Sequence, residues 1–95
     1  MPKQRGFDWD DGNRQKCERH GVSLAEIEEL FLNDPLISPD TVHSLNEERL
    51  LAIGRTISGQ AIFVVFTLRR RLGREFVRPI SARYMHKKEI DRYGR

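Results

Sequence analysis

Three groups of side chains in this sequence combine cations with groups that can exchange protons, as chemistry on a phosphate ester requires. They are Lys16, Arg19 and His20; Arg69 to Arg71 together with Arg83; and Glu47, Glu48 and Arg49. Arginine binds phosphate oxygens through two parallel N–H donors and stays protonated, so a rigidly held guanidinium can stabilise negative charge as it develops. The sequence therefore indicates phosphate chemistry, provided that the fold positions these groups suitably.

Arg69 and Arg83 are the predicted charge stabilisers, because each follows residues that are expected to form a strand. A side chain at the end of a rigid strand keeps its direction, and removing such a donor costs ~2–4 kcal/mol of transition-state stabilisation. We expect the two guanidinium groups to converge on one phosphodiester. The alternative for both is a role in surface solubility.

His20 is the candidate acid or base, because imidazole exchanges protons near neutral pH. Its alternative is a cation at a helix C-terminus, where it would interact with the helix dipole. Lys16, one helical turn earlier, could bind a phosphate or influence the protonation of His20, and a plain surface role is equally open. Glu47 is either a general base or an ion-pair partner of Arg49.

We expect neither a metal nor a cofactor. His20, His43, His86 and Cys17 do not have the spacing of zinc ligands. The sequence has no glycine-rich phosphate loop and no motif typical of a serine or cysteine nucleophile. Cys17 is therefore expected to be a small, packed side chain of a helix.

The net charge of +3 conceals an uneven distribution along the chain. Residues 1–48 carry five Lys/Arg against eleven Asp/Glu, a net charge of −6, whereas residues 49–95 carry twelve against three, a net charge of +9. Ten of those twelve cations are arginines, which favours a face that binds a polyanion over an unevenly charged solvated surface. Beyond the catalytic candidates, the predicted phosphate contacts are Arg49, Arg70, Arg71 and Arg78.

Ninety-five residues suffice for one modest core, so residues 1–95 are predicted to form a single domain. No apolar run approaches the ~20 residues that span a bilayer, and no export leader is evident, so we expect no contact with a membrane. A single cysteine fits the reducing cytoplasm.

The segment 61–68 is predicted to be the central strand of a sheet. It is continuously apolar and rich in β-branched and aromatic residues, which is typical of a strand covered on both faces; a buried helix is the competing interpretation. Ser58-Gly59-Gln60 predicts a hairpin turn between this strand and one over 49–57, where Gly54 marks a bulge or a close approach. The next turn is expected over 70–74.

A last strand is predicted over Glu75–Ala82. Pro79 cannot donate a ladder hydrogen bond, so this strand should be bulged or lie at an edge. Alternation places the residues on two faces, Phe76, Ile80 and Ala82 on one and Val77, Ser81 and Arg83 on the other. A short helix should follow over 86–93 with Ile90 and Tyr93 facing inward.

Two helices are predicted in the N-terminal half. Asp10 is an expected N-cap of a helix that runs to about His20 and ends at Gly21. The second helix begins with the capping box Ser23-x-x-Glu26 and ends at Asn33-Asp34-Pro35. Its apolar stripe consists of Leu24, Ile27, Leu30 and Phe31. Its solvated face consists of Glu26, Glu28 and Glu29. The segment 7–9 should either form a short strand or anchor the rings of Phe7 and Trp9 in the core, and 36–38 should form a short strand.

These elements predict an α+β fold, in which two N-terminal helices pack on an antiparallel meander of about four strands and a short C-terminal helix follows. The helices should cover one face of the sheet. The other face is then free for a ligand.

Four segments, in order and register, resemble BrnT-type toxins. They are F-D-W-D-x-G-N-R-x-K-C-x-R-H-G-V-S at 7–23, E-x-R-x-x-x-I-G at 47–54, V-V-F-T-x-R at 64–69 and I-S-A-R-Y-M at 80–85. The similarity covers nearly the whole chain. This chain departs from the family pattern at Cys17, where many relatives have Asn. In those relatives the spacing before the Lys/Arg-His-Gly sequence is also one residue longer.

The resemblance implies a RelE-like fold and a ribonuclease toxin of a type II toxin–antitoxin system, which inhibits translation by cleaving RNA. It also implies a BrnA-type antitoxin with a DNA-binding domain, contact with operator DNA only through that antitoxin, and a toxin–antitoxin hetero-oligomer. Arg69 and Arg83 both lie in matched segments. The alternative is a non-catalytic module that binds nucleic acid or a protein partner.

Overall fold

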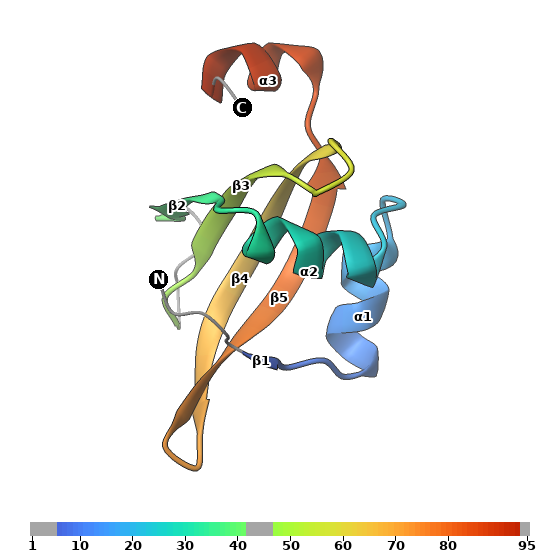
Figure 1. Ribbon diagram of the computed structural model, residues 1–95. Coiled ribbons are helices and arrows are strands. Elements are labelled where there is room, and N and C mark those ends of the chain that lie inside the picture. The colour runs from blue at the N-terminus through green and yellow to red at the C-terminus, as the bar shows by residue number, and fades with distance from the viewer. Residues whose placement is uncertain (1–5, 42–46, 94–95) are drawn as a thin grey trace.

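The computed structural model describes residues 6–41 and 47–93, which form strands and helices in the arrangement of Figure 1. In chain order they are β1 (Gly6–Phe7), α1 (Asp11–Glu18), α2 (Leu24–Leu32), β2 (Leu36–Pro39), β3 (Leu50–Arg55), β4 (Ala61–Arg71), β5 (Arg74–Tyr84) and α3 (Lys87–Tyr93). The predicted α+β class is confirmed. His43, considered above as a metal ligand, lies outside the described residues.

One sheet contains all five strands, in the order β1-β5-β4-β3-β2. β4 lies at its centre and pairs antiparallel with β3 and β5, so the predicted central strand is confirmed. The four strands β2 to β5 form the expected antiparallel meander. β1 is a fifth strand and pairs in parallel with β5. The sequence indicated a short strand here only as an alternative, because two residues show no periodicity.

α1 is joined to the sheet through its first turn. The Asp10 carboxylate accepts a hydrogen bond from the Asn13 backbone N–H, and the Asn13 side chain accepts one from the Asp10 N–H. The Asn13 amide also donates to the carbonyls of Asp8 and Pro79, so the cap ties the helix to β5. The helix ends at Glu18, two residues before the predicted end, and Gly21 adopts the expected left-handed conformation at φ 88°.

α2 begins with the predicted capping box, in which Ser23 and Glu26 exchange hydrogen bonds. Its apolar stripe is confirmed, but the prediction that its glutamates face water is wrong. Glu28 accepts a hydrogen bond from the indole N–H of Trp9 at 2.9 Å, and Glu26 accepts one from the Tyr84 hydroxyl at 2.8 Å. These carboxylates flank the stripe, where the polar ends of core aromatic residues reach them.

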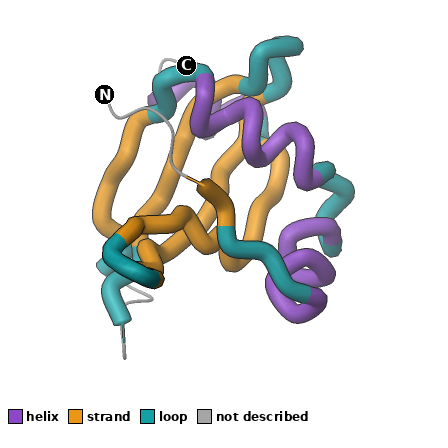
Figure 2. Tube along the Cα trace, turned by 60° about the horizontal axis from the view of Figure 1, so that its bottom comes forward, coloured by secondary structure: helices purple, strands orange, loops and turns teal. Residues whose placement is uncertain are grey.

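α1 and α2 cover one face of the sheet (Figure 2), and the larger core cluster lies between these layers. Phe7, Phe31 and Phe66 stack edge to face across it, which confirms the anchoring role of Phe7. Gly54 allows α2 to approach closely, because a Cβ at this position would lie 3.2 Å from Leu30 Cδ1. The buried residues of this cluster are Cys17, Val22, Ile27, Leu30, Ala52, Ile62, Val64, Phe66, Val77 and Ala82.

α3 covers one end of the opposite face of the sheet. Ile90 and Tyr93 pack against a smaller cluster that contains Ile53, Phe63 and Met85, so their predicted inward orientation is confirmed. The Phe63 and Tyr93 rings meet edge to face at 5.7 Å. The rest of this face is not covered by a described helix, as predicted.

β5 is bulged, and the bulge corrects the predicted faces of the strand. Val65 of β4 lies opposite Ser81, but Phe66 lies opposite Pro79, so Ile80 is the extra residue. The alternation therefore changes phase at Ile80. Val77 and Ala82, predicted to lie on opposite faces, both face α1 and α2. Pro79 indicated the irregularity correctly.

β4 is longer than predicted, and the turn after it is shorter. The strand runs through Arg71 instead of ending at Leu68, and the turn consists of Leu72 and Gly73 instead of 70–74. Both turn residues have positive φ, 52° and 77°, which is the conformation of a two-residue hairpin loop. The consecutive arginines therefore lie within the strand, with alternating directions.

Candidate active site

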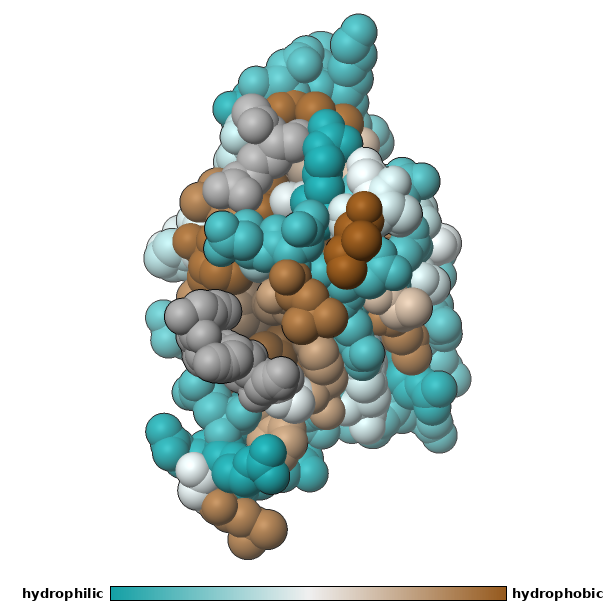
Figure 3. All heavy atoms as spheres, in the orientation of Figure 1, coloured by the Kyte–Doolittle hydropathy of each residue, from teal (hydrophilic) through white to brown (hydrophobic). Residues whose placement is uncertain are grey.

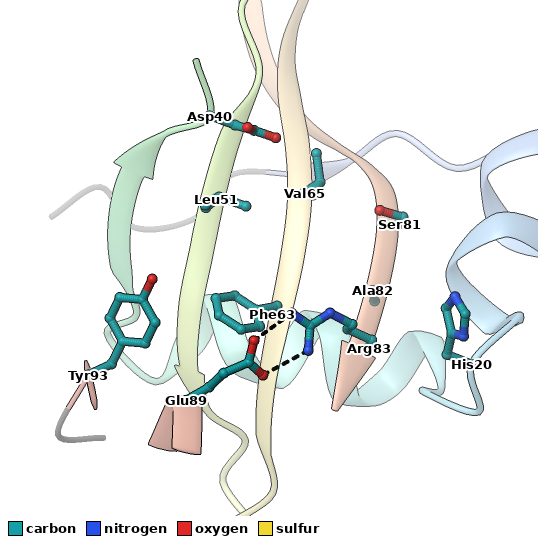
Figure 4. A pocket seen from close by; sticks show the side chains of 10 residues that line it. All are labelled: His20, Asp40, Leu51, Phe63, Val65, Ser81, Ala82, Arg83, Glu89 and Tyr93. Carbon is teal, nitrogen blue, oxygen red and sulfur yellow. Dashed lines mark hydrogen bonds and ion pairs between the residues drawn. The ribbon is translucent and has the colours of Figure 1, made fainter. Parts of the chain in front are cut away.

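A pocket of ≈ 420 Å³ opens on the face of the sheet opposite α1 and α2 (Figure 4). Its floor is formed by Leu51, Val65 and Ser81, which lie side by side on three neighbouring strands. Charged groups stand at its ends. The lining residues are His20, Asp40, Leu51, Phe63, Val65, Ser81, Ala82, Arg83, Glu89 and Tyr93.

The Arg83 side chain is held in this pocket by an aromatic ring and a carboxylate. Its guanidinium lies 4.6 Å from the centre of the Phe63 ring, opposite Arg83 in the β4–β5 ladder. Nη1 and Nη2 donate to the two carboxylate oxygens of Glu89 at 2.8 and 2.7 Å, and Nη1 also donates to the Tyr84 carbonyl. About two of its five N–H groups thus remain for a ligand.

Glu89 is the site residue that the sequence did not reveal. It lies in the first turn of α3 and also accepts a hydrogen bond from the His86 N–H at 2.9 Å. The hydrogen bonds from Arg83, with this backbone bond, lower the pKa of Glu89 to about 2, and the same pairing raises the pKa of Arg83. In the sequence, Glu89 is recognisable only as an acidic residue at the start of a predicted helix. Such a position predicts the end of a helix and not a pocket.

His20 reaches the same pocket from the end of α1. Figure 4 shows its ring beside β5 near Ala82, across the strand from the Arg83 guanidinium, which points towards Glu89. The turn that holds it is closed by the Gly21 N–H, which donates to the Glu18 carbonyl. The Gly21 carbonyl also lies 3.3 Å from the oxygen of the Tyr84 hydroxyl, which donates its hydrogen to Glu26. The structure thus brings together His20 and Arg83, which are 63 residues apart in the sequence.

Arg69 and Glu47 lie at the other end of the sheet. They form an ion pair of 3.3 Å with each other, and neither lines the pocket. Arg69 and Phe63 project to the same face, but they are six residues apart on β4, which corresponds to roughly 20 Å. The structure therefore does not bring Arg69 and Arg83 together at one phosphate.

The other predicted phosphate ligands lie outside the pocket. Lys16 is exposed on α1, and Arg49 is half-buried before β3. Arg70 and Arg71 lie near the end of β4. Asp8 joins two of the predicted ligands, since it pairs with Arg71 at 3.2 Å and with Arg78 at 3.5 Å; Arg78 also pairs with Asp10 at 3.0 Å.

Cys17 has the structural role that was expected. Its side chain is fully buried between α1 and the sheet, and burial raises the pKa of the thiol to about 11. Over residues 6–41 and 47–93, no three His, Cys, Asp or Glu side chains converge as metal ligands would. In the same ranges, no helix has the length and apolar character needed to cross a bilayer.

The sequence was compared with known protein families and with curated proteins to identify the family of the chain. No curated protein matches the chain. Residues 9–89, however, match the family described as "Ribonuclease toxin, BrnT, of type II toxin-antitoxin system". This range includes both helices that cover the sheet, the whole of β2 to β5, and the pocket residues His20, Arg83 and Glu89. The chain therefore belongs to the BrnT family of ribonuclease toxins, which have RNA as substrate and an antitoxin as partner.

Proposed function

We propose that this toxin cleaves RNA without a metal ion, by attack of a 2′-hydroxyl on the adjacent phosphate, and that the pocket beside α3 is the active site. The observation that carries the proposal is that His20 from the turn after α1, Arg83 from β5 and Glu89 from α3 line one pocket. These side chains supply a proton acceptor and a fixed positive charge, the two functions that the reaction needs from the protein.

In the proposed reaction, His20 takes the proton from the 2′-hydroxyl, whose oxygen forms a bond to phosphorus. The bond from phosphorus to the 5′-oxygen breaks, and this oxygen takes a proton from water at the open side of the pocket. Arg83 stabilises the negative charge of the transition state through its free N–H groups. The products are a 2′,3′-cyclic phosphate and a 5′-hydroxyl.

Glu89 has a positioning role in this proposal rather than that of general base. A catalytic base works best when its pKa lies near the working pH, and a carboxylate with a pKa of about 2 has little tendency to take a hydroxyl proton. Its two hydrogen bonds instead fix the guanidinium plane of Arg83 above Phe63. A fixed donor needs no reorganisation when charge develops.

The direct experiment is incubation of the purified toxin with an RNA oligonucleotide in EDTA. We expect cleavage, with 2′,3′-cyclic phosphate ends identified by mass spectrometry. A matched oligonucleotide with one 2′-deoxynucleotide at the cleavage position should remain intact. Cleavage of the deoxy-substituted bond, or a strict need for divalent metal, would contradict the proposed mechanism.

We also propose that the antitoxin is of the BrnA type and covers this face of the sheet. The support is the exposed pocket and the cations on the same face, which acidic residues of a partner could pair with. The hetero-oligomer would then contact operator DNA only through the antitoxin, in the cytoplasm. Addition of purified antitoxin should stop cleavage, and antitoxin should bind Arg83→Ala toxin more weakly than wild type.

A further inference from the structure

The β4–β5 hairpin extends beyond the rest of the sheet. The pairing of β3 with β4 begins at Leu50 and Phe66, so within the described residues no strand pairs with the following part of β4 on that side. Figure 1 shows this end of the hairpin projecting away from the helices. We call residues 69–76, with the turn Leu72–Gly73 at the tip, the hairpin arm.

The pleat of the arm places three of its four arginines on the face that carries the pocket, and Arg70 on the opposite face. Side chains alternate along a strand, so Arg69 and Arg71 project to the same face as Phe63 of the pocket. Arg74 lies opposite Arg71 in the ladder and therefore shares this face. Its guanidinium lies 5.7 Å from the centre of the Phe76 ring, two residues further along the same side of the strand.

The ion pairs of these arginines leave N–H groups that a phosphate can contact. Arg69 pairs with Glu47 at 3.3 Å and Arg71 with Asp8 at 3.2 Å, each through one nitrogen, and the arginine side chains are 44% and 63% exposed. The Arg69–Glu47 pair is accessible on both sides, and such pairs contribute little to stability and exchange readily with solvent. Asp8 is only 10% exposed and also pairs with Arg78, so a phosphate would contact the other N–H groups of Arg71, whose side chain is 63% exposed. Arg83, in contrast, is held by both carboxylate oxygens of one partner.

The tip of the arm departs from the usual chemistry of a hairpin turn. Leu72 is 100% exposed and has a φ of 52°, at a position where Asn, Asp or Gly is preferred. Figure 3 shows the lower end of the molecule as a hydrophilic stretch that ends in apolar atoms. Turn chemistry and solubility both disfavour leucine here, and local rules of this kind are broken mainly at functional sites.

We infer that the hairpin arm is a second RNA-contacting site, in which Arg69, Arg71 and Arg74 bind phosphates and Leu72 contacts a base or sugar of the same strand. This inference rests on the proposed function of the pocket. From Phe63 to Leu72 the chain advances nine residues, which is about 30 Å. At ~3.4 Å per phosphate of a stacked strand, RNA that reaches both sites needs about ten nucleotides.

The experiment compares two substrates, a dinucleoside monophosphate, which fills only the pocket, and a 20-nucleotide RNA, which reaches the arm. Arg74→Ala should leave kcat/KM for the dinucleotide unchanged and lower it about tenfold for the long RNA. The control is Arg14→Ala, which removes the same charge from the exposed surface of α1. It should affect neither substrate.

Binding measurements give an independent readout. With 2′-deoxy-blocked 20-nucleotide RNA, Arg74→Ala should reduce the slope of log Kd against log salt by about one, as expected for one lost phosphate contact. Leu72→Asn should weaken binding about fivefold, because roughly half of a leucine side chain is no longer buried. Its Tm should not fall, since asparagine suits positive φ.

The outcomes separate the arm from the pocket. If wild-type toxin fails to cleave the dinucleotide, the proposed active site is contradicted, whereas the salt slope still tests the arm. If Arg74→Ala and Leu72→Asn bind the long RNA like wild type, the inference about the arm is overturned. It is also overturned if these variants lose affinity only for antitoxin, because the arm would then be a protein-binding surface.

Discussion

The two ends of the β4–β5 hairpin hold the same kind of side chain in different ways. At the pocket end, Arg83 stacks on Phe63 and donates to both oxygens of Glu89 at 2.7 and 2.8 Å. At the arm end, Arg69 pairs with Glu47 at 3.3 Å through one nitrogen and one oxygen. The two arginine side chains are similarly exposed, 42% for Arg83 and 44% for Arg69, so the difference lies in how each is held. A fixed guanidinium can stabilise a transition state without reorganisation, whereas a loosely held one can adapt to many phosphates. On this difference rests our proposal that the pocket end performs the chemistry and the arm end contributes affinity.

His20→Ala tests whether chemistry belongs to the pocket end, and the largest effect is expected here. Removal of a general base should lower kcat by about 10²–10⁴-fold for long and short substrates alike. Added imidazole should restore part of the activity, measured by the initial rate of dinucleotide cleavage. His86→Ala is the control, an exposed histidine at the start of α3 that should change the rate little. Equal losses in both variants would contradict the assignment of His20.

Glu89→Gln tests whether the fixed geometry of Arg83 matters. The variant keeps one oxygen that can accept from Arg83 and replaces the other by an NH2 group that cannot, so the guanidinium loses its fixed plane. We expect kcat to fall about tenfold with KM little changed, because a small misplacement costs mainly transition-state binding. Glu18→Gln, on the exposed side of α1, is the matched control. A variant with unchanged kcat would show that Arg83 needs no such support.

The same ion pair should make the attachment of α3 sensitive to acid. The pKa of Glu89 is about 2 in the folded chain, against ~4.3 for an unperturbed glutamate, so the unfolded state binds more protons between these values. The stabilisation is present above pH ~4.3 and is lost as the pH falls towards 2. Thermal melts of wild type and Glu89→Gln should therefore differ at pH 6 and converge near pH 2. A constant difference would contradict this origin.

Arg69→Ala should have the smallest effect. An exposed single ion pair contributes about 0–1 kcal/mol, so the free energy of unfolding should change little. We expect KM for a 20-nucleotide RNA to rise about threefold and kcat to stay constant, as for removal of a binding contact that does not change in the transition state. A large loss of kcat would erase the contrast between the two ends and place Arg69 in the reaction.

Much of this fold followed from local patterns in the sequence. The caps at Asp10 and Ser23, the apolar stripe of α2 and the central strand all depend on neighbouring residues, and the structure confirms each. The wrong details have non-local causes. The phase change at Ile80 depends on which residue the ladder leaves unpaired, and the glutamates of α2 are partly buried because aromatic residues from other elements reach them.

The site was predictable in its residue types but not in its grouping. His20 and Arg83 stood out as chemistry-bearing residues and do line one pocket, whereas Arg69 lies at the far end of the same strand pair. Strand-end arginines look alike in sequence, because nothing local shows which end of a hairpin a cavity occupies. Glu89 was missed because its role depends on how α3 folds back over the sheet.

Single-turnover cleavage of a 20-nucleotide RNA in EDTA, by Arg83→Ala and Arg69→Ala side by side, tests the central claim most directly. Saturating protein removes differences in affinity, so the rate reports the chemical step alone. The account predicts that Arg83→Ala is slower than wild type by about 10²–10³-fold, as for loss of a charge-stabilising donor, and that Arg69→Ala keeps the wild-type rate. Equal rates for the two variants, or a slow Arg69→Ala with an active Arg83→Ala, would contradict it.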